Sequence, residues 1–372
     1  MRLASYNVEN LFDRAKAMNL DDPDDGKPIL EAFAELNNLL AKLAYAPADK
    51  TRMSELMVIL GLDKSDIGPF VILRRNRGSL LKRPPGGAVQ ITADGRAAWV
   101  GSLELRDEPL RHDAVLNTAR VIADVDADVL AVVEAESRPV LVEFNHAMIT
   151  EVGGAPYRHV MLIDGNDDRG IDVGLMTRDS FEIASMCSHV DDRLPGGAPI
   201  FSRDCPQYEI VTPAGNRLIL LINHLKSKGF GSPASSNAKR LAQAKRVREI
   251  YDALRAGGHQ HIAIVGDFND TPTSAPLAPL LQGSDLQDVS ALPAAQFDNA
   301  GFPGTFGSAT AANKIDYILL SPALFALAIR GGIDRKGMWP GTHPKKWDVF
   351  PELGKPEQAA SDHGAIWVDL NF

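Results

Sequence analysis

The chain is poor in cysteine and in aromatic side chains. Of its 372 residues only Cys187 and Cys205 are cysteines, and aromatic residues make up 6%. Two cysteines exclude a disulfide-rich scaffold and a zinc site built on cysteine. No apolar stretch approaches the roughly 18 residues of a membrane span, and the start, MRLASYNVEN, lacks the pattern of a signal peptide. We expect a cytoplasmic protein without a membrane span, although a removed leader would leave the same start.

Positive charge is also scarce. The chain has 39 lysines and arginines against 48 aspartates and glutamates, a net charge of -9. An acidic chain is not attracted as a whole to nucleic acid or to an anionic membrane. Binding of a polyanion would therefore need a local basic patch or a metal ion.

Apolar strand patterns recur along the chain, with helical periods between them. Several are continuous apolar runs, as expected for strands covered on both faces. This mixture predicts a layered α/β domain. The predicted strands lie at 2–8, 128–136, 172–178, 217–225, 261–268, 315–321 and 365–370, and the predicted helices at 28–45, 112–124 and 237–256.

Residues 46–110 differ from the rest and predict an insertion within a single domain spanning 1–372. The segment is poor in apolar runs, so we do not expect it to fold alone. Its second half, AVQITADGRAAWVGSLEL, predicts a β-hairpin that turns near Asp94–Gly95. The basic run that precedes this predicted hairpin consists of Arg74, Arg75, Arg77, Lys82 and Arg83.

Polar side chains follow several of the predicted strands. In IAIVGDFND at 262–270, a buried strand runs into Gly266 and then into Asp267, Asn269 and Asp270. In open sheets, binding and chemistry gather at strand ends. Oxygen-rich clusters without cysteine suit Mg²⁺, Mn²⁺ or Ca²⁺, which would neutralise a phosphodiester and activate water. The polar strand-end residues are Asn7, Glu9, Glu134, His224, Asp267, Asn269, Asp316, Asp362 and His363.

Seven motifs occur in a fixed order along nearly the whole chain: SYNVENLFD, ADVLAVVEAE, DRGIDVGLMTR, NHLKSKG, VGDFND, KIDYILLSP and SDHGAIWVDL. In these motifs the chain resembles the endonuclease/exonuclease/phosphatase (DNase I-like) superfamily, and in particular its bacterial nuclease branch. The insertion at 46–110 lies outside the resemblance. The resemblance implies a four-layer α/β sandwich, with two mixed β-sheets packed face to face and helices on the outside. It also implies a hydrolase of phosphoester bonds that depends on a divalent metal.

The resemblance assigns a role to each matching residue. Glu134 would be the principal metal carboxylate, with Asn7, Glu9 and Asp362 nearby. The family often has Asp where Glu9 stands, and the longer side chain makes a direct contact there less certain.

The remaining matches would act on the phosphate and on the attacking water. Asp267 would orient or deprotonate the water, steadied by Asn269. His363 would contact the phosphate, held by Asp316 through its other ring nitrogen. His224 would protonate the leaving oxygen or bind phosphate. Around these, Arg169 and Lys226 would contact phosphate oxygens, and Asp172 would organise hydrogen bonds.

Each residue alone also has a structural explanation. Glu134 could be a solvated strand end, His224 a core histidine, Asp316 a turn cap and Asp267 an Asx-turn residue. The ordered set favours the functional interpretation. We expect the remaining acids and histidines nearby, namely Asp270, His343 and the acids of DGNDD, to be surface or loop residues.

Fold does not decide substrate. Two features favour nucleic acid: the resemblance to the bacterial nuclease branch, and the basic run, in which Arg74, Arg75 and Arg77 could grip a phosphate backbone. The branch includes secreted DNases, so DNA is favoured over RNA. A solvated loop is the alternative for that run. The alternative functions are a small-molecule or lipid phosphoesterase, and a binding module without catalysis. The sequence leaves the oligomeric state open.

Overall fold

The computed structural model describes residues 1–18, 20, 23–167, 170–228, 232–342 and 345–372. Their contacts divide the chain into two compact units. Unit 1 comprises Met1–Phe12, Leu110–Lys228 and Ser232–Phe372, and unit 2 contains Asp13–Pro109. Each unit is described by itself below.

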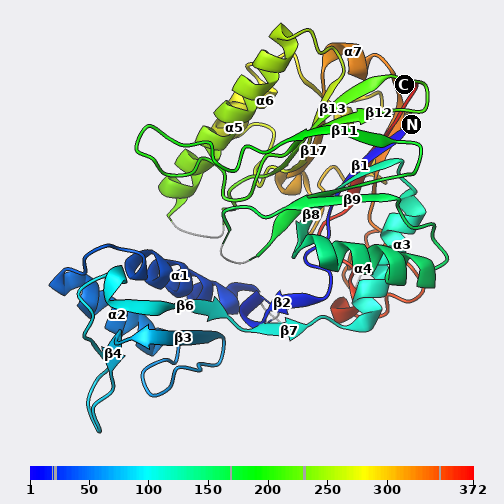
Figure 1. The fold of residues 1–372 in the computed structure, drawn as a ribbon. Coiled ribbons are helices and arrows are strands. Elements are labelled where there is room, and N and C mark those ends of the chain that lie inside the picture. Colours follow the sequence, from blue (N-terminus) through cyan, green and yellow to red (C-terminus); the bar gives the residue numbers. More distant parts are fainter. Residues whose placement is uncertain (19, 21–22, 168–169, 229–231, 343–344) are drawn as a thin grey trace. The chain divides into compact units, whose positions relative to one another are not determined.

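Unit 1 is built on a seven-stranded and a six-stranded mixed sheet (Figure 1). The seven-stranded sheet has the order β16 (Phe297–Asp298), β18 (Ala328–Asp334), β19 (Ala365–Leu370), β1 (Arg2–Asn7), β8 (Val129–Ala135), β10 (Asp172–Thr177) and β9 (His159–Ile163). The six-stranded sheet has the order β11 (Glu182–Cys187), β12 (Gln207–Val211), β13 (Arg217–His224), β14 (Ile262–Asp267), β17 (Asp316–Leu320) and β15 (Gln287–Asp288).

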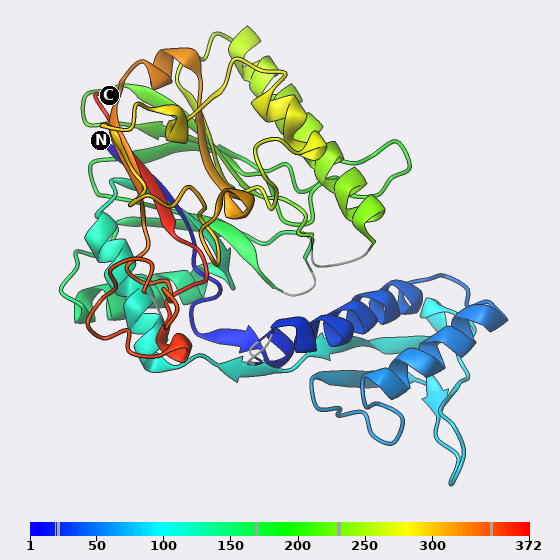
Figure 2. The same ribbon diagram turned by 180° about the vertical axis from the view of Figure 1, so that it is seen from behind.

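Three layers of apolar packing show how the sheets and helices stack. One hydrophobic cluster fills the space between the sheets and joins Leu3 and Val133 of one sheet to Leu220 and Val265 of the other. A second packs α3 (His112–Val125) and α4 (Arg138–Glu151) on the outer face of the seven-stranded sheet. A third packs α5 (Pro233–Ala256) on the outer face of the six-stranded sheet (Figure 2). The short helices are α6 (Ala278–Leu281) and α7 (Pro322–Phe325).

This arrangement confirms the predicted four-layer α/β sandwich. The seven predicted strands are all present, and each observed bound lies within one residue of the predicted bound. Fully buried strands have continuous apolar sequences, which makes them easy to locate. The two termini lie side by side, where the N-terminal amine of Met1 donates to the carbonyl of Leu370 at 2.7 Å (Figure 1).

Unit 2 has its own hydrophobic core, in which buried side chains such as Phe33, Met53 and Trp99 pack together. Its elements are β2 (Asp13–Ala15), α1 (Pro23–Leu40), α2 (Pro47–Ile59), β3 (Val71–Gly78), β4 (Leu81–Lys82), β5 (Gln90–Ile91), β6 (Trp99–Leu105) and β7 (Asp107–Pro109). Helix α1 packs on α2 in this core, so unit 2 takes in sequence that precedes the segment 46–110.

The hairpin predicted around Asp94–Gly95 is wrong. Strand β6 pairs with β3, and β5 pairs with β4. The turn residues instead contact the chain after α1, where the Tyr45 N–H donates to the Asp94 carbonyl and the Arg96 N–H to the Lys42 carbonyl. A Cβ at Gly95 would lie 1.9 Å from the Leu43 carbonyl oxygen, so the glycine permits this close approach.

Within the described residues, no helix has both the length and the apolar character needed to cross a membrane.

Candidate active site

Asn7, Glu134 and His363 lie at the same end of the strands of the seven-stranded sheet. Asn7 ends β1, which runs parallel to β8 with Asn7 opposite Val133. Strand β10 pairs Asp172 with Ala135 and Val173 with Val133, so Glu134 is the extra residue of a β-bulge. Its φ of 66° lies in the left-handed region, a strained conformation for a glutamate that often marks a functional site.

The six-stranded sheet contributes three more predicted residues in register. His224 lies opposite Asp267 in the parallel pair β13–β14, and Asp267 lies opposite Asp316 in the antiparallel pair β14–β17. All three are buried, with exposed fractions of 2–3%. Asp267 makes the hydrogen bond of an Asx-turn, because its Oδ1 accepts the N–H of Asn269 two residues on, so its structural role exists beside any functional one.

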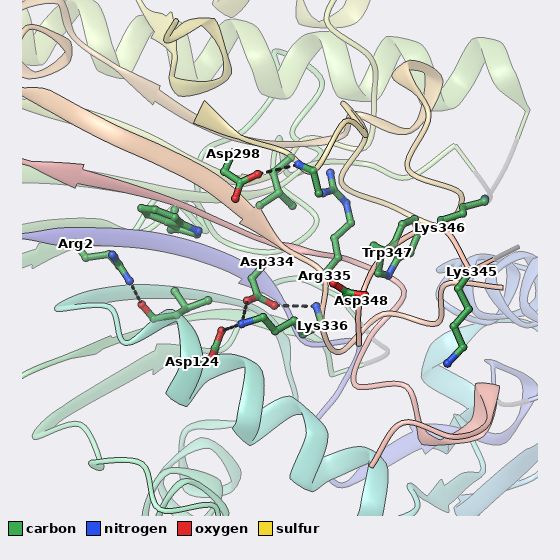
Figure 3. Close-up of a pocket in the computed structure, with 14 residues that line it drawn as sticks. Arg2, Asp124, Asp298, Asp334, Arg335, Lys336, Lys345, Lys346, Trp347 and Asp348 are labelled. Carbon is green, nitrogen blue, oxygen red and sulfur yellow. Dashed lines mark hydrogen bonds and ion pairs between the residues drawn. The ribbon is translucent and has the colours of Figure 1, made fainter. Parts of the chain in front are cut away.

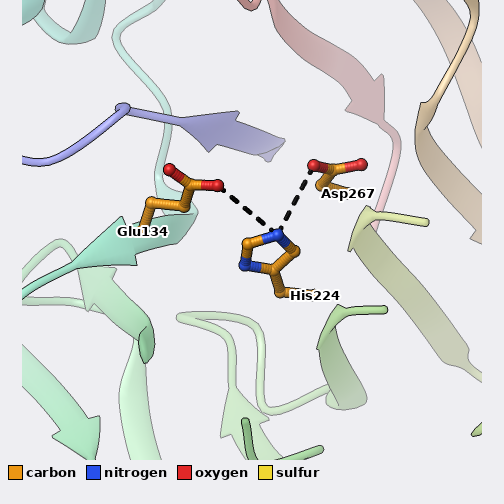
Figure 4. A group of neighbouring side chains, drawn as sticks. All are labelled: Glu134, His224 and Asp267. Carbon is orange, nitrogen blue, oxygen red and sulfur yellow. Dashed lines mark ion pairs between the residues drawn. The ribbon is translucent and has the colours of Figure 1, made fainter. Parts of the chain in front are cut away.

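Side chains from the two sheets meet in a compact cluster (Figure 4). The Nε2 atom of His224 lies 3.4 Å from Glu134 Oε1 and 3.7 Å from Asp267 Oδ2. The Nδ2 atom of Asn7 donates to the same two carboxylates, at 3.2 Å to Glu134 and 3.3 Å to Asp267. A buried histidine between two carboxylates differs from an ordinary core histidine, which is surrounded by apolar groups.

His363 is paired with Asp316 as predicted. Its Nδ1 lies 2.8 Å from Asp316 Oδ2, and its Nε2 faces Asn7 Nδ2 at 3.5 Å. Burial lowers the pKa of His363, but the charge and hydrogen bond of Asp316 more than offset this, so the pKa lies well above its usual value. The ring of Phe306 contacts the imidazole, with ring centroids 4.8 Å apart. His363 is therefore held in one orientation and favours the imidazolium form.

Asp267 receives hydrogen bonds from Asn269 on both of its oxygens. The backbone N–H of Asn269 donates to Oδ1 at 2.7 Å, and its side-chain Nδ2 donates to Oδ2 at 3.1 Å. Burial, followed by the charge of Asp316, raises the pKa of Asp267 to about 8. Such a carboxyl group is mostly protonated at neutral pH and can accept a proton only where a nearby positive charge restores its carboxylate form.

The loop after β1 carries Glu9 and links two strand ends. The N–H of Glu9 donates to Asn7 Oδ1 at 3.0 Å, and Glu9 Oε2 accepts from the Asp362 N–H at 3.1 Å. Asp362 Oδ1 lies 3.6 Å from His363 Nε2. Asn7, Glu9 and Asp362 therefore lie around the cluster, and Asn7 turns its Nδ2 rather than its Oδ1 towards the carboxylates.

Two other predicted site residues lie next to members of the cluster along the chain or in the sheet, since Asp172 pairs with Ala135, and a third lies outside the described residues. Lys226 lies two residues after His224, and its N–H donates to Gln243 Oε1 at 2.7 Å. Asp172 accepts from the Gly165 N–H at 2.8 Å, and burial raises its pKa to about 6. Arg169 lies outside the described residues.

Arg74, Arg75 and Arg77 lie on β3 of unit 2. Arg74 Nε pairs with Glu104 at 2.5 Å and Arg75 Nη2 with Asp66 at 2.6 Å. Two of the three arginines thus have acidic partners within their own unit.

The donor set of the cluster fits a divalent cation. Glu134, His224 and Asp267 offer ligand atoms that lie within 4.8 Å of one another, and so do Asp267, Asp316 and His363. Carboxylate oxygens suit Mg²⁺, Mn²⁺ or Ca²⁺ and imidazole nitrogens suit transition metals, so this donor set could hold a divalent cation of either kind. A cation here would also favour the carboxylate form of Asp267, because an opposite charge offsets burial.

A pocket of approximately 640 Å³ lies elsewhere in unit 1, lined by Asp124, Asp334, Trp347 and other residues (Figure 3). Several of its charged groups are paired with protein partners. Lys336 Nζ donates to Asp124 at 2.6 Å, and Arg2 donates to the Val125 carbonyl at 2.6 Å. This pairing is typical of a structural network, and the lining contains none of the predicted catalytic residues.

The expectation that Asp270 is a surface or loop residue is wrong as regards exposure. Asp270 is 3% exposed and pairs with Arg240 Nε at 2.9 Å and with Lys228 Nζ at 2.6 Å. Among the acids of DGNDD, Asp167 pairs with the buried Arg203 at 2.8 Å. His343 and Asp168 lie outside the described residues. Sequence reasoning also missed Phe306 and Arg240. The only feature of the sequence that could have indicated them is that each lies within about a dozen residues of one of the motifs.

Comparison with known proteins identifies the family of the chain. The sequence pattern described as the Endonuclease/Exonuclease/phosphatase family matches residues 100–363. The chain belongs to this family. Members of the family are hydrolases that act on phosphoester bonds and typically depend on a divalent metal. A comparison with curated proteins found no match.

Solved structures of the family share the fold at low sequence identity. The chain is similar to the mannosyl-6-phosphatase of Bacteroides thetaiotaomicron, with a TM-score of 0.50 and 19% identity over 70% of this chain and 90% of that one. It is also similar to the catalytic domain of human nocturnin with a bound sulfate anion, with a TM-score of 0.50 and 16% identity over 71% of this chain and 88% of that one.

Proposed function

We propose that the chain is a divalent-metal-dependent phosphodiester hydrolase that acts on DNA. The observation that supports this most strongly is that strand ends of the two sheets lie next to each other. The strand ends of the seven-stranded sheet supply Asn7, Glu134 and His363, and those of the six-stranded sheet supply His224, Asp267 and Asp316. Carboxylates, an amide and two histidines at one buried point provide ligands, a base and acids for attack on phosphorus.

In this proposal Glu134 is the principal metal ligand, with Asp362, Glu9 and Asn7 around it. The bound metal supplies Lewis-acid stabilisation of the charge that develops on the phosphate. The bulged backbone at Glu134 fixes the position of its carboxylate before substrate arrives. Asn7 donates to Glu134 and Asp267 and so holds these two like charges near each other.

Proton transfer is assigned to three other side chains. Asp267, oriented by Asn269, accepts a proton of the attacking water at a carboxylate oxygen. His363, kept as imidazolium by Asp316, donates its Nε2–H to a phosphate oxygen. His224 protonates the leaving oxygen or binds the phosphate. Lys226, Asp172 and Arg169 are proposed to arrange the phosphate around these groups.

The alternative is a small-molecule or lipid phosphoesterase of the same family. Two observations favour it: the net charge of -9, and the acidic partners of Arg74 and Arg75, which reduce the field of the basic run. One of the similar structures is a mannosyl-6-phosphatase, a name that denotes the hydrolysis of a sugar phosphate. The bacterial nuclease motifs favour DNA, and we retain it as the main proposal.

A cleavage assay decides between the two. Plasmid, single-stranded DNA, RNA and bis-p-nitrophenyl phosphate are each incubated with Mg²⁺, Mn²⁺, Ca²⁺ or EDTA. We expect plasmid cleavage with Mg²⁺ or Mn²⁺ and none with EDTA. Hydrolysis of the small ester with every polynucleotide intact would support the alternative. Inertness towards all four substrates with every metal would contradict the main proposal.

The basic run is expected to act only on long substrates. Each phosphate contact that is lost flattens the slope of log K against log salt by ~0.9. Replacing Arg74, Arg75 and Arg77 by Ala should therefore raise KM for plasmid and flatten its salt dependence. The hydrolysis of bis-p-nitrophenyl phosphate should stay unchanged, because this split is typical of lost remote binding with intact chemistry. Initial rates at several salt concentrations measure both.

Arg52→Ala is the matched control for this experiment. Arg52 belongs to the same unit and is exposed, but it lies on α2 instead of β3. It pairs with Glu35 of α1 and with Glu55 of its own helix. If the arginines of β3 only hold unit 2 together, the triple variant will lose thermal stability and both substrates will respond alike. If they are a solvated face, the triple variant will behave like Arg52→Ala.

A further inference from the structure

Arg240 is a fully buried arginine beside the candidate active site. It lies on α5, and its side chain is 0% exposed. A buried guanidinium is costly unless its N–H groups and its charge are satisfied. The partners of Arg240 therefore indicate what its burial accomplishes.

Each side of the guanidinium has a specific partner. Nε donates to Asp270 Oδ2 at 2.9 Å, and Nη2 donates to Asn237 Oδ1 at 2.7 Å. Nη1 donates to the backbone carbonyl of Lys226. The carboxylate of Asp270 balances the charge, which leaves the Lys226 carbonyl as the contact that connects Arg240 to the end of β13.

Gln243, one turn further along α5, contacts the same residue from the other side. Its Oε1 accepts the N–H of Lys226 at 2.7 Å, and Gln243 is also 0% exposed. Two side chains of one helix thus bind both the N–H and the carbonyl of Lys226. Such double attachment fixes the backbone of a residue that lies outside any helix or strand.

The segment held by α5 is joined on its other side to the catalytic strand end. The Leu225 N–H donates to the Asp267 carbonyl at 2.9 Å. The Leu225 carbonyl accepts from Asn269 Nδ2 at 3.1 Å, the same nitrogen that donates to Asp267 Oδ2. Displacing Lys226 would therefore displace Leu225 and alter the hydrogen bonds of Asn269.

We propose that Arg240 and Gln243 are positioning residues that set Lys226 relative to Asp267 and Asn269. Neither touches substrate, and both act through the backbone of Lys226. The inference rests on the proposed function, in which Lys226 contacts phosphate, and it adds the helix α5 to the determinants of that contact. Arginine is required because its planar fork reaches Asp270 and the carbonyl together, which a lysine cannot do.

A double-mutant cycle tests the proposal. Arg240→Lys keeps the charge but loses the fork, and Gln243→Leu removes the acceptor of the Lys226 N–H. Each is combined with Lys226→Ala, and kcat/KM is measured for bis-p-nitrophenyl phosphate and for plasmid. We expect each single variant to lose ~10-fold to ~10²-fold, as for small displacements of a reacting group. In the Lys226→Ala background the further loss should be smaller than in the wild type, because the part carried by the Lys226 side chain is already gone and only the part that passes through Leu225 to Asn269 remains.

Arg248→Lys is the control on the same helix, because Arg248 bonds Asp252 at 2.7 Å and donates to the carbonyls of Pro279 and Gly283, away from the end of β13 in the sequence. Melting temperatures identify variants that fail to fold, and Gln243→Leu remains informative if Arg240→Lys does not fold. Losses that are fully additive with Lys226→Ala, or equal to that of Arg248→Lys, would overturn the proposal.

The same double-mutant cycle is also measured with a second quantity, the affinity for a fluorescein-labelled oligonucleotide in EDTA. This measurement needs no turnover. If the wild type hydrolyses no phosphoester, the proposed function fails. The positioning of Lys226 is then judged by the same non-additivity in oligonucleotide affinity: additive changes there overturn it, and non-additive changes support it.

Discussion

Replacing Glu134 by Gln is expected to lower phosphodiester hydrolysis by at least ~10²-fold while the protein stays folded. Changes in the groups that merely support metal ligands cost up to ~10²-fold, so loss of charge at the ligand itself should cost more. The amide keeps the shape of the side chain, and the bulge at Ala135 and Val133 does not depend on its charge. The Asn7 amide can still donate to the remaining oxygen.

The measurement pairs activity with metal binding. Initial rates on plasmid, the Mg²⁺ or Mn²⁺ affinity by calorimetry, and the melting temperature are compared for wild type, Glu134→Gln and Glu143→Gln. Glu143 is an exposed glutamate on α4 and serves as the matched control. Wild-type cleavage that continues unchanged in EDTA, or a Glu134→Gln variant with wild-type rate and metal affinity, would refute the metal assignment.

The strands and their polar ends could be predicted because burial leaves a direct mark on sequence. A strand covered on both faces consists of apolar residues, so a polar group after Val133 or Gly266 stands out. Pairing in the sheets then places these ends next to one another, as seen for His224, Asp267 and Asp316. The resemblance carried by the ordered motifs also predicted two sheets packed face to face, with the polar strand ends of both in one site.

The supporting contacts could not be predicted in the same way. Asp270 follows Asp267 by three residues and looks like one more loop acid. Its burial depends on Arg240, 30 residues earlier in the chain, whose side chain crosses from α5. No local pattern distinguishes a buried arginine on a helix from the exposed ones beside it.

The short strands of unit 2 show a second limit. Asp94–Gly95 is a genuine turn signal, but its backbone bonds to Lys42 and Tyr45 instead of closing a hairpin. The partner of β6 is β3, whose second half, Arg74–Gly78, is exposed and basic and therefore lacks the apolar signature of a strand. Two-stranded pairings of this kind depend on tertiary contacts more than on local sequence.

The second large effect is expected at His363. Replacing it by Ala should lower the hydrolysis rate by ~10²–10⁴-fold, the range for a positioned acid or base. His146→Ala, an exposed histidine on α4, is the control and should leave the rate unchanged. Single-turnover rates on plasmid separate the chemical step from product release, and the melting temperature checks the fold, because Phe306 loses its ring contact in this variant.

Asp316→Asn is expected to cost less than His363→Ala, because it weakens the orientation and charge of the imidazole without deleting it. In the double variant, Asp316→Asn should add little to the loss from His363→Ala, since the carboxylate acts through Nδ1 of His363 at 2.8 Å. Asp316 also contributes to the raised pKa of Asp267, second to burial, so a small residual effect is consistent with the assignment. A full second loss in the double variant would mean that Asp316 acts mainly on Asp267 or on the metal. Wild-type rates in both single variants would dismiss the pair from the mechanism.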